Sequence, residues 1–190
     1  MPNNILMYFC QTIFFKMNYS TSDFTLGILG GGQLGKMLLQ VTSRLSIKTN
    51  VLDPSNDSPC KEMCSEFTRG QLMDFDAVYN FGKKCDVVTY EIEHVNVDAL
   101  EKLERNGINV YPDSKTLKII QDKSTQKDFF IKNNIPTANH KYFKSLKDLE
   151  SIKYPCVWKK TKFGYDGYGV KILKSKEDFK NLPETEFIIE

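Results

Sequence analysis

The feature that most constrains this fold is an apolar strand that runs into consecutive glycines and then into a helix. Residues 25–29 are almost entirely apolar and precede three glycines at positions 30–32. A short apolar run bounded by turn residues is typical of a strand buried in a parallel sheet. Residues 33–45 then carry apolar side chains with a helical period, at Leu34, Met37, Leu38 and Val41. The stretch predicts a strand–turn–helix unit of an α/β protein.

The alternation of strands and helices continues to about residue 112. We predict strands over residues 48–52, 66–69, 86–90 and 109–111, and helices over residues 75–81 and 97–103. Strands and helices that alternate at this spacing predict a doubly wound parallel sheet with right-handed crossovers.

The character of the sequence changes after Pro112. Two helices are predicted there, over residues 114–121 and 124–133. Shorter elements follow, namely strands over residues 142–143, 155–160, 170–173 and 187–190 and short helices over residues 146–151 and 176–181. This part of the chain predicts a smaller unit that is distinct from the first.

The composition excludes several classes of protein. Of 190 residues 41% are hydrophobic, and 26 Lys and Arg against 24 Asp and Glu leave a net charge of +2. No nucleic-acid partner is expected without a basic excess, and no membrane partner is expected without a run of roughly 20 apolar residues. The five cysteines lack the further ligands of a zinc site and are expected to be reduced, mostly buried thiols of a cytoplasmic protein.

Residues 1–24 differ from the rest and are interpreted as an extension. They lack the basic n-region and the small-residue cleavage site of a signal peptide. Met17 begins a polar stretch that leads directly into the first strand. We expect Met17 to be the natural start, with residues 1–16 disordered or not native.

The first glycine loop, residues 30–35, has the pattern G-x-G-x-x-G between a strand and a helix. Glycine allows a tight turn, and the helix N-terminus offers free N–H groups to an anion. Asp53, at the end of the next strand, stands where nicotinamide-dinucleotide enzymes have a ribose-binding acid. The residues leave three interpretations open: NAD(P) binding, binding of another phosphate-bearing ligand, or a turn without a ligand.

Two carboxylates, Glu91 and Glu93, follow the strand over residues 86–90. Doubly wound sheets bind ligands at this edge, and a period of two would put both carboxylates on one face. There they could accept hydrogen bonds from ribose hydroxyls or from an amine. The alternative is a solvated loop that caps the next helix. His94 is expected to make local hydrogen bonds and no metal site.

The second glycine loop, residues 164–169, lies between two predicted strands and follows several lysines. Backbone N–H groups of such a loop can turn inward onto a polyphosphate, and lysine adds a compact positive charge. The loop is not a Walker loop, because no G-K-S/T follows its glycines. The alternative is an ordinary glycine-rich hairpin with solvated lysines.

In combination these segments resemble the 5-(carboxyamino)imidazole ribonucleotide synthases, an ATP-grasp family of purine biosynthesis. The resemblance extends to Glu190 and rests on five segments in order, residues 28–38, 88–95, 119–127, 135–138 and 164–167. It implies an α/β fold in which a doubly wound, Rossmann-like pre-ATP-grasp domain precedes the small α+β lid subdomain of ATP-grasp. The implied parts are residues 25–112 for the first domain, 113–140 for a helical connection and 141–190 for an incomplete lid.

The resemblance also implies a reaction. ATP, bicarbonate and 5-aminoimidazole ribonucleotide would give the N5-carboxyamino product, ADP and phosphate, through carboxyphosphate. A closing loop would protect that labile intermediate from water, and magnesium would bridge the ATP phosphates. The family resemblance further suggests a homodimer.

Site residues follow from the resemblance by position. The implied ATP-binding residues are Lys123, Lys159, Gly164, Tyr165, Asp166, Gly167, Tyr168, Gly169, Val170 and Glu190. The implied substrate-binding residues are Gly32, Gln33, Leu34, Glu91 and Glu93. Tyr165 and Asp166 are also the implied catalytic residues, with Asp166 orienting the amine of the aminoimidazole.

The sequence departs from the family at three places. Tyr168 stands where the family often has Lys or Arg, and Val170 where it often has Gln, so we expect backbone contacts to phosphate there. The magnesium ligands of the family lie beyond Glu190. The chain is therefore expected to be an N-terminal fragment that does not hydrolyse ATP in response to the ribonucleotide, with residues 187–190 as an unpaired edge strand.

Three other functions are considered. A formate-dependent glycinamide ribonucleotide transformylase of the ATP-grasp type shares the overall plan. An NAD(P)-dependent oxidoreductase would use the first glycine loop and Asp53, and leaves the second loop unexplained. A regulatory nucleotide-binding module would carry no chemistry.

Overall fold

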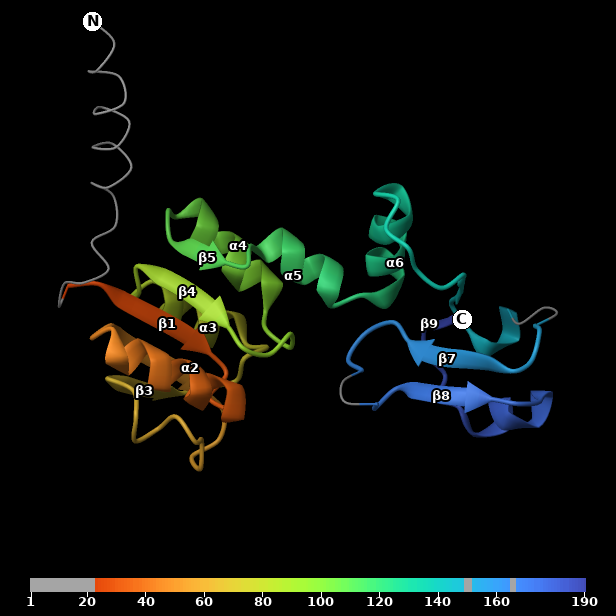
Figure 1. Cartoon of the computed structure of the whole chain (residues 1–190), viewed down its shortest axis with the longest axis horizontal. Helices are drawn as coiled ribbons and strands as arrows, with labels where there is room; N and C mark the ends of the chain where they lie inside the picture. The colour runs from red at the N-terminus through yellow and green to blue at the C-terminus, as the bar shows by residue number, and fades with distance from the viewer. Residues whose placement is uncertain (1–22, 149–151, 165–166) are drawn as a thin grey trace, which may run out of the picture. The chain divides into compact units, whose positions relative to one another are not determined.

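The computed structural model describes residues 23–148, 152–164 and 167–190. The described residues form two compact units, one up to Ser114 and one from Lys115 (Figure 1). The fold is mixed α/β, because the first unit contains a five-stranded parallel sheet and the second a four-stranded antiparallel sheet. No described helix has both the length and the apolar character needed to span a membrane.

The sheet of the first unit has the strand order β3-β2-β1-β4-β5. Its strands are β1 (Thr25–Leu29), β2 (Lys48–Asp53), β3 (Glu66–Arg69), β4 (Val87–Tyr90) and β5 (Asn109–Tyr111). The direction of winding reverses between β1 and β4, and doubly wound sheets bind ligands outside the carboxyl ends of the strands at that point. The predicted doubly wound parallel sheet is confirmed.

Helices cover both faces of this sheet. They are α2 (Gln33–Arg44), α3 (Phe75–Gly82) and α4 (Val97–Arg105). Leu39 of α2 packs with Ile28 and Val51 on one face, whereas Gly27, which points to the other face of β1, lies against Phe81 of α3.

Helices α3 and α4 begin at capping residues and pack closely together. Asp74 accepts a hydrogen bond from the Ala77 N–H (2.6 Å), and Asn96 accepts one from the Ala99 N–H (2.9 Å). Such caps satisfy N–H groups that the helix itself leaves unpaired. A β-carbon on Gly82 would overlap Leu103 Cδ1, so this approach of the two helices requires glycine.

The buried face of α2 is not the one that its apolar period indicates. Gly35, Leu39 and Thr42 are buried, whereas three apolar residues of the predicted period are 54–62% exposed, namely Leu34, Met37 and Val41. The reason is the close approach of Gly35 to the first glycine turn, where an added β-carbon would lie 2.9 Å from the Gly30 carbonyl oxygen. Gly35 therefore faces the sheet, and residues four and seven positions later share its face.

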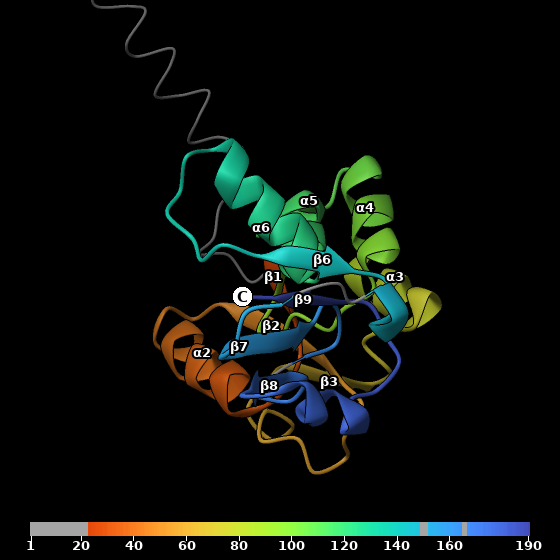
Figure 2. The ribbon, with the colours of Figure 1, turned by 90° about the vertical axis from the view of Figure 1, so that its right-hand side faces the viewer.

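The second unit combines two helices with the antiparallel sheet. The helices are α5 (Ser114–Ile120), which begins at the boundary of the units, and α6 (Lys123–Lys132). The strands are β6 (Lys141–Phe143), β7 (Cys156–Lys160), β8 (Val170–Leu173) and β9 (Phe187–Ile189), in the order β6-β9-β7-β8 (Figure 2). Two 3₁₀ turns, η1 (Leu146–Asp148) and η2 (Lys176–Asn181), stand where short helices are predicted.

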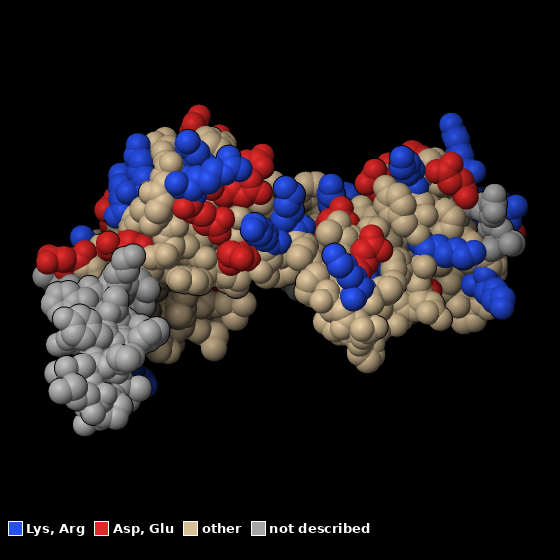
Figure 3. Space-filling model, turned by 90° about the horizontal axis from the view of Figure 1, so that it is seen from above, with Lys and Arg blue, Asp and Glu red and all other residues tan. Residues whose placement is uncertain are grey.

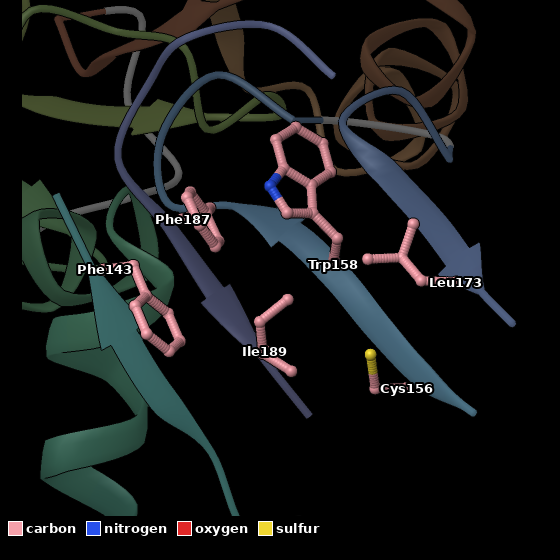
Figure 4. Close-up of a cluster of buried hydrophobic side chains, with 6 residues drawn as sticks. All are labelled: Phe143, Cys156, Trp158, Leu173, Phe187 and Ile189. Carbon is pink, nitrogen blue, oxygen red and sulfur yellow. The ribbon is translucent and has the colours of Figure 1, made fainter. Parts of the chain in front are cut away.

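One face of this sheet carries the hydrophobic core of the second unit. All four strands contribute to it, and Figure 4 shows their side chains on the same side of the sheet. The core residues are Phe143, Cys156, Trp158, Leu173, Phe187 and Ile189. The rings of Phe143 and Phe187 stack with centroids 5.3 Å apart, which joins β6 to β9 through side chains as well as backbone.

The prediction of an unpaired edge strand at residues 187–190 is wrong. β9 lies inside the sheet, where Ile189 pairs with Lys141 of β6 and with Trp158 of β7. All three residues of β9 are buried, and an apolar strand that is buried on both faces is stable only with neighbours on both edges.

The described cysteines are free thiols. Cys60, Cys85 and Cys156 are buried and Cys64 is partly buried. Burial, with smaller contributions from nearby acidic groups, raises the pKa of Cys60 to about 11 and that of Cys85 to about 12. Both thiols therefore stay protonated and poorly reactive at neutral pH.

Figure 3 shows one face of the protein with charged side chains of both signs. On the face shown in Figure 3, lysines and arginines are interspersed with aspartates and glutamates. This face thus lacks the single basic stripe of a nucleic-acid-binding surface.

The buried face of α2 can be tested by two matched truncations. We expect Leu39→Ala to lower the free energy of unfolding by about 2–5 kcal/mol, because it leaves a cavity in a closed core. Val41→Ala, on the exposed face, should change it by about 0.5 kcal/mol or less. Urea unfolding followed by circular dichroism measures both, and equal effects would contradict the assignment of the faces.

Candidate functional site

The first glycine loop lies at the switch point of the parallel sheet. Gly30 has a φ of +100°, and a β-carbon there would lie 2.8 Å from Glu91. Both the backbone angle and the available space therefore require glycine. The Gly30 N–H donates to the Leu52 carbonyl oxygen (2.9 Å), which joins the turn to the end of β2.

Two carboxylates hold the next two residues of this loop. The Gly31 N–H donates to Asp53 Oδ2 (2.7 Å), and the Gly32 N–H donates to Glu91 Oε1 (3.1 Å). The second oxygen of Asp53 accepts from the Ser55 N–H (2.8 Å). One oxygen of Asp53 thus braces the glycine loop and the other braces the turn that follows β2. Because both oxygens already accept hydrogen bonds, the NAD(P) interpretation loses the acid on which it rested.

The carbonyl groups of the loop are bound as well. Ser58 Oγ donates to the Gly31 carbonyl oxygen (2.7 Å), and Cys60 Sγ lies 3.7 Å from the Gly32 carbonyl oxygen. Both side chains are buried. The loop therefore has a fixed shape in this structure.

The N-terminus of α2 leaves main-chain N–H groups at the same place. The structure gives α2 no side-chain cap, and the first N–H groups of a helix lack partners within it. In α2 these belong to Gln33 and Leu34, directly after the loop. Such groups, together with the helix dipole, favour an anion.

Glu91 and Glu93 lie in a bend and not on a strand. β4 ends at Tyr90, so the predicted period of two does not apply to them. Glu91 is turned toward the glycine loop, where it accepts from Gly32. The first unit therefore brings together four of the predicted substrate-binding positions, Gly32, Gln33, Leu34 and Glu91.

In the second unit, the start of α6 is joined to the end of β7. The Lys123 N–H donates to the Thr161 carbonyl oxygen (2.8 Å). Asp122 caps α6 through the N–H groups of the following residues (2.9 and 3.1 Å) and forms an ion pair with Lys162 (3.5 Å). Lys123 Nζ consequently lies 3.8 Å from the position of a β-carbon on Gly164.

The second glycine loop is closed at its neck. The Lys160 N–H donates to the Gly169 carbonyl oxygen (2.8 Å), and a β-carbon on Gly164 would lie 2.8 Å from the Tyr168 carbonyl oxygen. Gly167 and Gly169 have φ values of +84° and +75°. The predicted catalytic residues Tyr165 and Asp166 lie outside the described residues.

Glu190 lies between two lysines. Lys127 Nζ is 2.6 Å from Glu190 Oε1, and Lys159 forms an ion pair with Glu190 Oε2. Burial by itself would raise the pKa of Glu190, but the hydrogen bonds and charges of Lys127 and Lys159 outweigh it and hold the pKa below its ordinary value.

An apolar surface adjoins this cluster. Val170 and Ile172 of β8 are 40% and 65% exposed. They pair with Lys159 and Val157 of β7 in the antiparallel register, so all four side chains share one face. Around β7 the second unit thus gathers positive charge, a glycine hairpin and an exposed apolar face.

No three His, Cys, Asp or Glu side chains gather into a metal-binding group among the residues that the structure describes.

Residues 24–121 match the family model of the ribonucleotide synthetase preATP-grasp domain. The chain belongs to this family. The match covers the whole parallel sheet of the first unit and the first glycine loop.

Individual similar proteins extend the similarity into the second unit. The chain is 39% identical to phosphoribosylaminoimidazole carboxylase of Candida glabrata over 82% of this chain and 29% of that protein. The crystal structure of N5-carboxyaminoimidazole ribonucleotide synthetase from Thermotoga maritima matches with a TM-score of 0.79 and 36% identity, over 88% of this chain and 45% of that one.

A further solved structure contains ligands. It is the N5-carboxyaminoimidazole synthase of Aspergillus clavatus in complex with ADP and 5-aminoimidazole ribonucleotide, with a TM-score of 0.74 and 31% identity over 88% of this chain and 46% of that one. This chain spans less than half the length of each of these three proteins.

Sequence reasoning missed residues that hold the two sites in place. The bracing roles of Asp53 and Ser58 carry no sequence signal of their own, because they depend on the sheet that brings β2 and its following loop to the turn. Lys127 carried a signal, since it lies four residues after Lys123 and hence on the same face of α6.

Removal of the Asp53 carboxylate tests its bracing role. We expect Asp53→Ala to lower the free energy of unfolding by about 2 kcal/mol or more, because two N–H groups lose a charged acceptor. Asp57→Ala, an exposed residue on the following loop, should change it by about 0.5 kcal/mol or less. Urea unfolding measures both, and an unaffected Asp53→Ala protein would remove this role.

Acid titration tests the charge of Glu190. Folding lowers the pKa of Glu190 below its ordinary value of 4.5, so the ionised side chain stabilises the folded protein at a pH above 4.5. This contribution to the unfolding free energy is lost as the pH falls through the pKa of the folded state. Glu190→Gln should therefore flatten the decline of the unfolding free energy below pH 4.5. Equal slopes in the unaltered and the Glu190→Gln proteins would refute the assignment.

Proposed function

We propose that the full-length protein carboxylates 5-aminoimidazole ribonucleotide with bicarbonate in an ATP-dependent reaction of purine biosynthesis, releasing ADP and phosphate. The observation that carries this proposal is the meeting of Lys123, Lys159 and the second glycine loop around β7. The names of the three similar proteins support the same reaction.

We assign ATP to the second unit. Its triphosphate would bind the ammonium groups of Lys123 and Lys159 and the backbone of the glycine loop, residues 164–170. The exposed face of Val170 and Ile172 offers an apolar surface for the purine base, and Glu190 stands at its edge. Tyr168 would contribute through its backbone.

We assign the ribonucleotide substrate to the first unit. Because Gly31 and Gly32 already donate to carboxylates, the substrate phosphate would bind the N–H groups of Gln33 and Leu34 at the helix N-terminus. Glu91 and Glu93 would accept hydrogen bonds from ribose hydroxyls or from the amine. Their negative charge favours such donors over a second anion.

The chemistry proceeds in two steps. A bicarbonate oxygen attacks the γ-phosphorus of ATP, which forms carboxyphosphate and releases ADP. In the direct path the substrate amine attacks the carboxyl carbon, the C–O bond to phosphate breaks, and the departing phosphate takes up the proton that the amine loses. In the alternative path carboxyphosphate first splits into carbon dioxide and phosphate, and the amine then attacks the carbon dioxide and passes its proton to phosphate. Asp166 would orient the amine and Tyr165 would contact the aminoimidazole, while the loop excludes water from the labile intermediate.

Magnesium, when bound, would neutralise charge on the ATP phosphates. Among the residues that the structure describes, no three acidic, histidine or cysteine side chains gather into a group that would hold it. We further propose that the full-length protein is a cytoplasmic homodimer. In this chain its domains would be residues 25–112, 113–140 and 141–190, preceded by an extension up to residue 24.

An assay of the full-length protein tests the reaction. We expect ADP release that depends on both 5-aminoimidazole ribonucleotide and bicarbonate, since the amine and the carboxyl donor are both needed for turnover. Release with glycinamide ribonucleotide and formate instead would identify the related transformylase and overturn the proposal. The isolated 190-residue chain should show no substrate-dependent release.

Asp166→Asn tests the assigned catalytic role. It should lower turnover about tenfold or more while ADP affinity changes little, because the carboxylate acts on the amine and not on the nucleotide. Asp128→Asn is the matched control with the same chemical change on the exposed face of α6. Unchanged turnover in Asp166→Asn would remove this residue from the chemistry.

A further inference from the structure

The ion-pair cluster at Glu190 contains one carboxylate and two ammonium groups. The side chains of Glu190, Lys127 and Lys159 are 9%, 12% and 27% exposed. The cluster therefore holds a net charge of +1 in largely desolvated surroundings. A cluster of this kind keeps one positive charge for an anion that approaches from outside.

The two lysines are held differently. Lys127 Nζ contacts Glu190 and also donates to Thr137 Oγ1 (2.7 Å), so two partners from different segments fix it. Lys159 is more exposed, lies on the strand that leads into the second glycine loop, and pairs with Glu190. Lys159 is therefore the ammonium group that can exchange its partner.

An exchange at Lys159 requires that Glu190 keep a counter-ion. A largely buried carboxylate that loses all its partners is strongly destabilised, because desolvation is no longer offset. With Lys127 in place, Glu190 stays paired when Lys159 turns to a phosphate. Without Lys127, each phosphate contact of Lys159 would leave Glu190 unpaired.

We propose that Lys127 is a positioning residue for nucleotide binding, which neutralises Glu190 and so releases the Lys159 ammonium group for a phosphate. This inference rests on the proposed function, because it takes ATP as the ligand of the second unit. It assigns Lys127 a role in phosphate affinity without contact to the nucleotide.

A double-mutant cycle in the full-length protein tests this role, with ADP and adenosine as probes in isothermal titration calorimetry. Lys127→Met should weaken ADP binding about tenfold or more and adenosine binding by less than about twofold, because the effect passes through a phosphate contact. In the Glu190→Gln background the same change should alter ADP affinity by less than about twofold, since no buried charge is left to neutralise.

Three variants complete the design. Lys127→Arg keeps the charge and should bind ADP within about threefold of the unaltered protein. Lys132→Met removes an exposed lysine of the same helix and should have no effect. Lys127→Gln, which loses the charge and keeps a donor, replaces Lys127→Met if that protein does not fold, with the same expected loss.

The outcomes separate this inference from the proposed function. If the unaltered protein does not bind ADP, the proposed function is overturned and the role of Lys127 falls with it. If the unaltered protein binds ADP, but Lys127→Met weakens ADP binding equally with and without the Glu190→Gln change, the neutralising role alone is overturned. Equal losses for ADP and adenosine would overturn it as well.

Discussion

The hydrogen bonds from Gly31 and Gly32 to the carboxylates of Asp53 and Glu91 are the interaction on which the first unit depends. They tie the turn after β1 to the ends of β2 and β4, the two strands that flank it. The shape of this turn brings Gly35 close to the Gly30 carbonyl oxygen, which determines which face of α2 is buried. Acidic groups thus shape the backbone at the edge of the sheet where we propose that the substrate phosphate binds.

In the second unit, too, a carboxylate joins elements that are far apart in the sequence. Glu190, directly after β9, connects α6 and β7 through Lys127 and Lys159. Asp122 also connects α6 to β7, because it caps the start of α6 and forms an ion pair with Lys162, which follows β7. Because these contacts pair charges near the glycine loop, the position of each lysine depends on more than its own strand or helix.

The helices and strands could be predicted from local sequence. The elements against which each of them packs or pairs could be predicted only in part. Strand β1 and helix α2 follow from an apolar run, glycines and a helical period, which are local properties. The exposure of Met37 and Val41 could not be predicted, because the approach of Gly35 to Gly30 overrides the apolar period. The central place of β9 depends on pairing with residues 27 to 48 positions earlier, from Lys160↔Phe187 to Lys141↔Ile189, which no local pattern records.

The candidate site shows the same division. Lys123, Lys159 and Glu190 were found through a family resemblance, and the structure brings each to β7 or its neighbours. The ion-pair partner Lys127 was not predicted, since it meets Glu190 only after α6 and β9 have packed. The sequence motifs predict which residues bind a ligand. The residues that hold those side chains in place are identified only from contacts in the folded structure.

The inner position of β9 has a consequence for the order in which the chain matures on the ribosome. The first unit is complete in sequence once residue 114 has emerged, so it can fold while synthesis continues. The second unit cannot close its sheet until residues 187–189 have emerged, because β9 joins β6 to β7. Until then β6 and the hairpin of β7 and β8 remain as two separate pieces, each with an open edge exposed to other nascent chains.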